Sequence, residues 1–135
     1  MTEMEKKPLK VLIAEDEDDI LALYKDYFSA RGHILVSSII TGNDVMGDFE
    51  KLMPDICLID YRLVGNTNGI DAAMKILNKY PSTSILIITG YGNVSEEIRN
   101  HPELVGKNIE VLLKPAKMTT IEEAMWKLAH ATKKD

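Results

Sequence analysis

Cysteine is nearly absent from this sequence, and long apolar runs are missing. The 135 residues include one cysteine, Cys57, so an intrachain disulfide is impossible and a reducing compartment is favoured. No apolar stretch approaches the ~20 residues of a membrane-spanning helix, and the first residues lack the apolar segment of a secretory signal. We therefore expect a cytoplasmic protein without a membrane partner.

An excess of positive charge is also missing. The chain carries 16 Lys and Arg against 21 Asp and Glu, a formal net charge of -5. These totals give no support to a polyanion-binding surface, so we expect no direct nucleic-acid partner. The length and the 45% of apolar residues suit one domain with one core. We expect this domain at residues 9–132, between a disordered N-terminal tail at 1–8 and a short C-terminal tail at 133–135.

Short apolar runs alternate with amphipathic stretches along the chain. The runs predict five strands, at residues 11–14, 34–40, 56–59, 85–88 and 109–113. Helical spacing of apolar residues predicts helices over 20–28, 45–53 and 70–77, and a shorter helix around Val94 and Ile98. Strands that are apolar on both sides and separated by helices indicate an α/β fold, a doubly wound parallel sheet covered on both faces.

Two helix ends carry their own signals. Gly32 is a plausible C-terminal stop for the first helix. The stretch TTIEEA holds two overlapping capping-box patterns, Thr119 with Glu122 and Thr120 with Glu123, which predict that the last helix begins there.

Polar side chains follow four of the five predicted strands. They are Glu15 and Asp16 after the first strand, Asp60 after the third, Thr89 after the fourth and Lys114 after the fifth. A doubly wound sheet places its chemistry outside the carboxyl ends of its strands, so these side chains are expected to meet.

The three carboxylates Glu15, Asp16 and Asp60 indicate a cation. Two like charges ~4 Å apart repel by about 4 kcal/mol at an effective dielectric of ~20, so the cluster needs a cation or protons. An all-oxygen site suits Mg²⁺ or Mn²⁺. The neighbouring acidic residues 17–19 are assigned to the N-terminus of the first helix, where negative charge is favourable.

Lys114 and Thr89 add a second pattern. A lysine brings positive charge to an anionic guest, and a threonine hydroxyl can donate a hydrogen bond to the same guest. A carboxylate nucleophile, a divalent metal, a lysine and a hydroxyl are together what is needed to hold a phosphoryl group on an aspartate.

Four short motifs carry a resemblance to a known family. IAED, CLID, IITG and LLKP, in this order and at these separations, resemble the receiver domains of two-component response regulators, and the likeness spans about residues 9–132. The resemblance implies a five-stranded flavodoxin-like (βα)5 fold with strand order 2-1-3-4-5.

The resemblance also implies a role for each site residue. Asp60 would accept a phosphoryl group from a sensor histidine kinase or a histidine phosphotransfer protein. Mg²⁺ would be bound by Asp16, by Asp60, by Glu15 directly or through water, and by the backbone carbonyl of Arg62. Lys114 would pair with the phosphoryl oxygens.

Two further implications concern the same site. Thr89 would turn toward the phosphoryl group, and Pro115 would follow a cis peptide bond that points Lys114 into the site. The site would catalyse only its own phosphorylation and a slow autodephosphorylation, so we expect a switch, not an enzyme.

The expected output is a contact with an unidentified protein or a phosphorelay. No effector domain is recognisable after the predicted receiver, so we expect a stand-alone receiver. We expect a monomer or a weak dimer that depends on phosphorylation.

The sequence departs from the family pattern at Val111. Members often carry Tyr or Phe at this position, three residues before the lysine, as a partner of the threonine. A valine cannot make the large inward swing, so the usual coupling to an output face is either absent or carried by backbone movement and some other side chain. Arg62 and Tyr91 each stand two residues beyond a key group, at positions where the family sets the phosphoryl lifetime by admitting or blocking water. The resemblance and these two bulky side chains together predict slow dephosphorylation.

Two alternatives remain. One is a pseudo-receiver, a binding module that keeps the fold without the phosphorylation. The other is a phosphatase of the haloacid dehalogenase type, which requires an Asp-x-Asp that Asp60 followed by Arg62 does not provide.

Several other residues are expected to have only structural roles. His33, His101 and His130 make no ligand spacing and are expected at surface or boundary positions. Trp126 lies off the apolar stripe of the last helix, where packing against a neighbouring element is favoured over a partner contact. Cys57 is expected to be a buried structural thiol.

Overall fold

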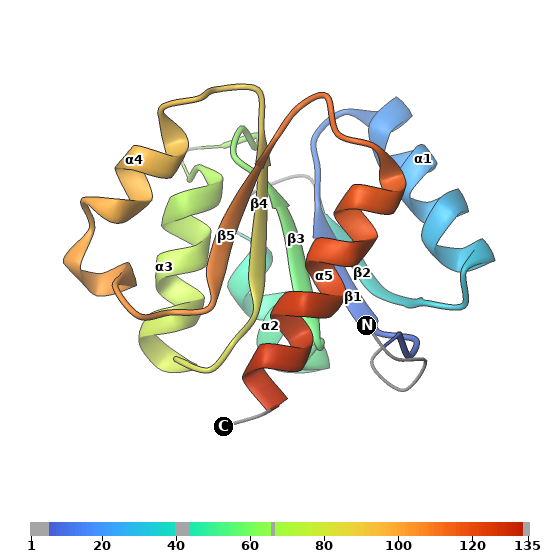
Figure 1. Cartoon of the computed structure of the whole chain (residues 1–135), viewed down its shortest axis with the longest axis horizontal. Coiled ribbons are helices and arrows are strands. Elements are labelled where there is room, and N and C mark those ends of the chain that lie inside the picture. The colour runs from blue at the N-terminus through green and yellow to red at the C-terminus, as the bar shows by residue number, and fades with distance from the viewer. Residues whose placement is uncertain (1–5, 40–43, 66, 134–135) are drawn as a thin grey trace.

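A parallel five-stranded sheet forms the centre of the molecule (Figure 1). The computed structural model describes residues 6–39, 44–65 and 67–133. The strand order is β2-β1-β3-β4-β5, so the predicted fold class and order are confirmed. The strands are β1 (Lys10–Ala14), β2 (Ile34–Ile39), β3 (Ile56–Asp60), β4 (Ile85–Thr89) and β5 (Ile109–Leu113). Each predicted strand is present, although residue 40 of the second run lies outside the described residues.

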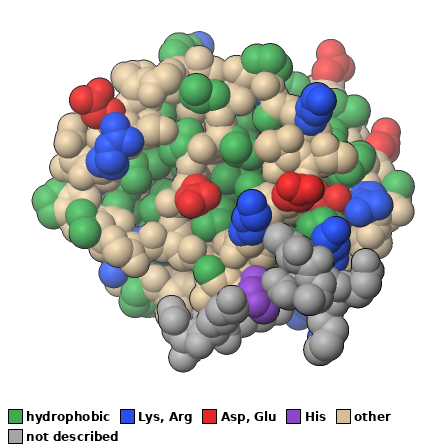
Figure 2. Space-filling model, viewed as in Figure 1, with side chains coloured by type: hydrophobic (Ala, Val, Ile, Leu, Met, Phe, Trp, Pro, Cys, Tyr) green, Lys and Arg blue, Asp and Glu red, His purple; other side chains and the backbone are tan. Residues whose placement is uncertain are grey.

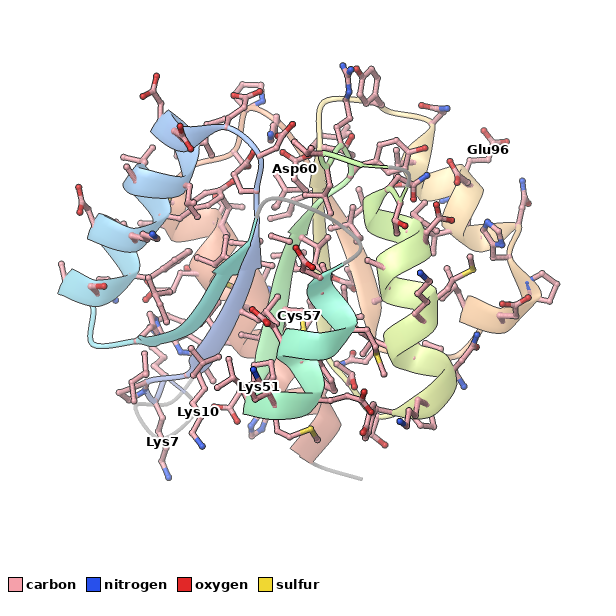
Figure 3. All side chains as sticks on the ribbon, turned by 180° about the vertical axis from the view of Figure 1, so that it is seen from behind. Lys7, Lys10, Lys51, Cys57, Asp60 and Glu96 are labelled. Carbon is pink, nitrogen blue, oxygen red and sulfur yellow. The ribbon has the colours of Figure 1, made fainter. Side chains whose placement is uncertain are left out.

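Helices cover both faces of the sheet. They are α1 (Asp18–Ala30), α2 (Val45–Leu52), α3 (Gly69–Lys79), α4 (Val94–Arg99) and α5 (Met118–Lys133), with a 3-10 turn, η2, at Pro102–Leu104. α1 and α5 lie on one face, and α2, α3 and α4 on the other (Figure 1; Figure 3 gives the view from behind). Gly32 has a φ of 92°, the left-handed conformation expected just after a helix end.

The core has one apolar cluster on each side of the sheet. Phe28 and Met125 are fully buried on the side of α1 and α5, and Ile76 is fully buried on the other side. All five residues of β3 and of β4 are buried, because these central strands are covered on both faces. The continuous apolar runs of the sequence are explained by this burial.

His33 contradicts the prediction of a surface or boundary position. Its side chain is buried, and its Nε2 lies 2.6 Å from Oε2 of the equally buried Glu122. The backbone N–H of Leu9 donates to His33 Nδ1 at 3.0 Å, so Nε2 carries the proton and donates to Glu122. Arg31 Nε donates to both oxygens of Glu122, at 3.1 and 3.2 Å. His101 and His130 are half-buried, as expected of boundary residues.

The start of the last helix was also predicted wrongly. α5 begins at Met118, so Thr119 and Thr120 lie inside the helix and do not cap it. Glu122, assigned to a capping box with Thr119, is instead turned inward and bound to His33, and the first helical bond runs from the N–H of Ile121 to the carbonyl of Lys117.

The predictions of purely structural roles for Trp126 and Cys57 are confirmed. Trp126 is buried, and its Nε1 donates to the carbonyl of Lys7 at 2.9 Å. Cys57 is fully buried in the middle of the sheet (Figure 3), and burial raises the pKa of its thiol.

Within the described ranges, none of the helices has the length and apolar character needed to cross a bilayer. Figure 2 shows acidic, basic and apolar side chains interspersed on the face that carries β5 and α5.

Candidate functional site

The residues predicted to form a site meet at the carboxyl edge of the sheet. Figure 3 shows Asp60 at the end of β3, with Lys10, the first residue of β1, at the opposite edge. Parallel strands of similar length bring their last residues together, which explains the gathering. The pocket at this edge has a volume of about 420 Å³. Its lining residues are Asp16, Glu17, Asp60, Arg62, Thr89, Gly90, Tyr91 and Lys114.

Three carboxylates form an acidic cluster beside the pocket. Glu15, Asp16 and Asp60 each offer an oxygen, and these oxygens all lie within 4.8 Å of one another. Glu15 is 1% exposed and Asp60 is 6% exposed. Glu15 Oε2 accepts a bond from the N–H of Glu17 at 3.1 Å, whereas its Oε1 is buried without a hydrogen-bond donor among the described residues. A buried carboxylate oxygen without a hydrogen-bond donor, next to two more carboxylates, fits a hard divalent cation.

The charged groups in the site lie close together. Burial, and then the neighbouring Asp60, raises the pKa of Glu15 to about 8. Lys114 Nζ lies 2.8 Å from Asp60 Oδ2 and 3.7 Å from Glu15 Oε1. Partial burial opposes the charge of Lys114, but Asp60 and then Glu15 outweigh it, and its pKa is raised. One lysine therefore partly offsets the mutual repulsion of the carboxylates.

The backbone around Asp60 is held from two sides. The N–H of Arg62 donates to Asp60 Oδ1 at 3.1 Å, and the N–H of Gly69 donates to the carbonyl of Tyr61 at 2.7 Å. A Cβ atom at Gly69 would lie 2.5 Å from the carbonyl oxygen of Asp60, closer than real Cβ contacts come. Only a glycine lets α3 begin this close to the end of β3.

The sequence interpretation missed this role of Gly69. A signal was available, since a glycine as the first residue of a helix is a poor helix former with no other evident purpose. Asn68, just before it, forms a reciprocal capping box with Asp71 that fixes the start of α3.

Thr89 and Lys114 are joined through the backbone. The N–H of Lys114 donates to the carbonyl of Thr89 at 2.7 Å. Thr89 is 1% exposed, and its Oγ1 accepts a bond from the N–H of Tyr91 at 3.0 Å. The peptide bond between Lys114 and Pro115 is cis, as the resemblance implied.

Arg62 and Tyr91 meet across the mouth of the pocket. Arg62 Nη1 donates to the hydroxyl of Tyr91 at 2.7 Å, and the guanidinium carbon lies 5.8 Å from the centre of the tyrosine ring. Both side chains are exposed. The role of the Arg62 carbonyl as a metal ligand stays a prediction.

The sequence as a whole matches a known family. The family model described as the response regulator receiver domain matches residues 11–125. The chain belongs to this family. Receiver domains are signalling switches, and this membership argues against the haloacid dehalogenase alternative.

The receiver relatives are longer than this chain. The luminescence regulatory protein LuxO of Vibrio campbellii is 28% identical over 86 residues, which are 64% of this chain and 18% of LuxO. Protein-glutamate methylesterase/protein-glutamine glutaminase 2 of Paramagnetospirillum magneticum is 31% identical over 83 residues, 61% of this chain and 23% of that protein. The chain thus spans a minor part of the length of these two relatives.

Solved receiver domains share the fold. The PhyR receiver domain of Erythrobacter litoralis has a TM-score of 0.75 at 24% identity and covers 91% of both chains. The receiver domain of a modulated diguanylate cyclase from Desulfovibrio desulfuricans has a TM-score of 0.79 at 24% identity, covering 94% of this chain and 98% of that one. At such identities the likeness shows the fold alone.

Proposed function

We propose that this receiver is a switch that accepts a phosphoryl group on Asp60 from the phosphohistidine of a sensor histidine kinase or a histidine phosphotransfer protein. The observation that carries the proposal is the Asp60 carboxylate, bound to Lys114 at 2.8 Å and clustered with Glu15 and Asp16 at the edge of the pocket. This arrangement presents a nucleophile, a counter-charge and a set of hard-metal ligands to one space.

Phosphoryl transfer needs the nucleophile to be oriented. A carboxylate oxygen of Asp60 attacks phosphorus, the new P–O bond forms as the P–N bond breaks, and the leaving imidazole nitrogen takes up a proton from solvent. The Arg62 N–H, bound to Oδ1, fixes the rotation of the Asp60 carboxylate. Lys114 and Thr89 then provide positive charge and a hydroxyl donor for the phosphoryl oxygens.

A divalent metal completes the site. Glu15, Asp16, Asp60 and the backbone carbonyl of Arg62 would hold Mg²⁺, or Mn²⁺, and the Glu15 oxygen without a hydrogen-bond partner supports this set. When bound, the metal supplies positive charge that offsets both the carboxylates and the transferred phosphoryl group.

Phosphorylation then changes the balance of two conformations. The phosphoryl group adds roughly 1.5 to 2 negative charges at the edge of the sheet, and any conformation that pairs these charges better gains population. We propose that the output is a protein contact or a further phosphorelay step in the cytoplasm.

The test is incubation of the purified chain with a small-molecule phosphodonor and Mg²⁺, followed by intact mass measurement. An added phosphoryl group that is absent from the Asp60→Asn variant supports the proposal. A chain that takes up no phosphate although it binds Mg²⁺ would be a pseudo-receiver. Steady turnover of diverse phosphoesters would indicate a phosphatase.

A further inference from the structure

The usual aromatic partner of the threonine is missing from β5. Val111 occupies that position, is half-buried and packs against the apolar cluster on the side of α3 and α4. A small β-branched side chain fixed in this packing has no large swing available. Any response of Thr89 must therefore reach the rest of the molecule through other groups.

Tyr91 is attached to Thr89 directly. Its backbone N–H donates to Thr89 Oγ1 at 3.0 Å, so the position of the hydroxyl and the position of this backbone are linked. The Tyr91 ring contacts the ring of Tyr61 edge to face, with centroids 6.2 Å apart and planes at 68°. This geometry is among those that aromatic pairs prefer.

Tyr61 continues the chain of contacts to α4. Its hydroxyl donates to Oε1 of Glu97 at 3.4 Å, and Glu97 lies on α4. Burial, and then Glu97, raises the pKa of Tyr61, so the hydroxyl remains a donor. Tyr61 is half-buried and packs against the same apolar cluster as Val94 and Ile98 of α4. Tyr61 also directly follows Asp60, the proposed acceptor.

We propose that Tyr91 and Tyr61 are positioning residues that couple Thr89 to α4, in place of the aromatic residue missing at position 111. The coupling rests on the proposed function, because phosphorylation of Asp60 is what moves Thr89. It names α4 as the element that responds.

The coupling follows from the contacts. When Thr89 Oγ1 turns toward a phosphoryl oxygen, the N–H of Tyr91 loses its acceptor and the two rings readjust. The bond from Tyr61 to Glu97, at 3.4 Å, is longer than the usual 2.7–2.8 Å of such bonds, so a small shift of the ring breaks it. α4 has six residues, too few for a helix to be stable on its own, and so depends on such contacts.

Hydrogen exchange of the backbone amides of α4 measures the coupling. In the wild type, phosphorylation is expected to change the exchange rate across residues 94–99 several-fold. In Tyr61→Phe, which loses the bond to Glu97, this change should fall to less than half, while the mass gain of the phosphoryl group stays the same. The matched control is Tyr80→Phe. The Tyr80 hydroxyl also donates to a glutamate, Glu50, at 2.8 Å, but this pair does not line the site. This control should respond as the wild type does.

Glu97 provides a conservative pair of variants. Glu97→Gln keeps an oxygen acceptor for Tyr61 and should keep the response of α4, whereas Glu97→Ala should lose it. If Glu97 had only a structural role, Glu97→Gln and Glu97→Ala would show the same change in α4 exchange on phosphorylation. An unchanged response in Tyr61→Phe and Glu97→Ala would overturn the proposal.

A second arm does not need phosphate, so that failure of the coupling and failure of the proposed function are distinguishable. Thr89→Ala removes the acceptor of the Tyr91 N–H and should raise the exchange of α4 in the unphosphorylated chain. In a Tyr61→Phe background, Thr89→Ala should raise the exchange rate of α4 no further. Such non-additivity is expected of coupled residues. Additive effects of the two substitutions would refute the coupling whether or not Asp60 is phosphorylated.

Discussion

The Nζ atom of Lys114 lies 2.8 Å from Oδ2 of Asp60, so the proposed acceptor and the lysine from the last strand form an ion pair. The pair brings together residues that are 54 positions apart in the sequence. It also shows where the counter-charge stands before any phosphoryl group arrives.

Replacing Lys114 with glutamine should therefore slow phosphorylation. The loss of one preorganised group of this kind typically lowers a rate by about 10²–10³. Phosphate uptake from a small-molecule donor, followed by intact mass over time, measures it. Lys127→Gln on the exposed side of α5 is the control and should leave the rate unchanged. Equal rates in Lys114→Gln and the wild type would contradict the role of the lysine.

Magnesium should stabilise the fold. At a concentration a hundredfold above Kd, a ligand that binds only the folded state adds about 2.7 kcal/mol. Thermal unfolding with Mg²⁺ and with a chelator should thus differ in the wild type and differ little in Asp16→Asn. Asp26→Asn, an exposed position on α1, should retain the full effect of the metal. An equal effect of the metal in Asp16→Asn would exclude this residue as a ligand.

Gly69→Ala should destabilise the chain and slow phosphorylation together. The added Cβ would stand 2.5 Å from the Asp60 carbonyl oxygen, and overpacking of this kind costs about 1–3 kcal/mol. Urea unfolding and phosphate uptake measure the two effects. Gly47→Ala is the opposite control. Apart from the neighbouring backbone of its own helix, nothing lies within 4 Å of its Cβ position among the described residues, and alanine favours the helix α2 by roughly 0.5–1 kcal/mol. Unchanged stability and phosphate uptake in Gly69→Ala would show that α3 can shift away from Asp60 to make room for the Cβ.

Glu122→Ala should cost about 1–3 kcal/mol of stability, because it leaves the buried Nε2–H of His33 without an acceptor. Urea unfolding of this variant is compared with that of Glu123→Ala, at an exposed position of the same helix turn, which should stay within about 0.5 kcal/mol of the wild type. Equal effects at the two positions would argue that the buried pair adds nothing.

Arg62→Ala should shorten the lifetime of the phosphorylated state several-fold. The bond from Arg62 Nη1 to the Tyr91 hydroxyl, at 2.7 Å, spans the mouth of the pocket, and its loss opens the acyl phosphate to water. Loss of the phosphoryl mass after removal of the donor gives the lifetime. Rapid Mg²⁺-dependent loss already in the wild type would contradict the predicted slow dephosphorylation.

The strands and the gathering of the site could be predicted from the sequence because both depend on local patterns. Runs such as Ile56–Asp60 are buried on both faces and need no distant partner to be recognised. The pairing of His33 with Glu122, across 89 positions, has no local signature, so the sequence alone predicts a boundary position for a histidine that is buried. The contact between Tyr61 and Glu97 escaped for the same reason.

The close packing of Gly69 against Asp60 bears on which side of the site has room to move. On the side of β3, the start of α3 contacts the backbone of Asp60, so this backbone cannot move toward α3. On the side of β4, the Thr89 hydroxyl accepts a hydrogen bond from Tyr91, which lies in an exposed segment that begins at Gly90. We therefore expect the charge of a phosphoryl group to displace the β4 side of the pocket, in the direction of α4, because the absence of a Cβ at Gly69 lets α3 pack tightly on the other side.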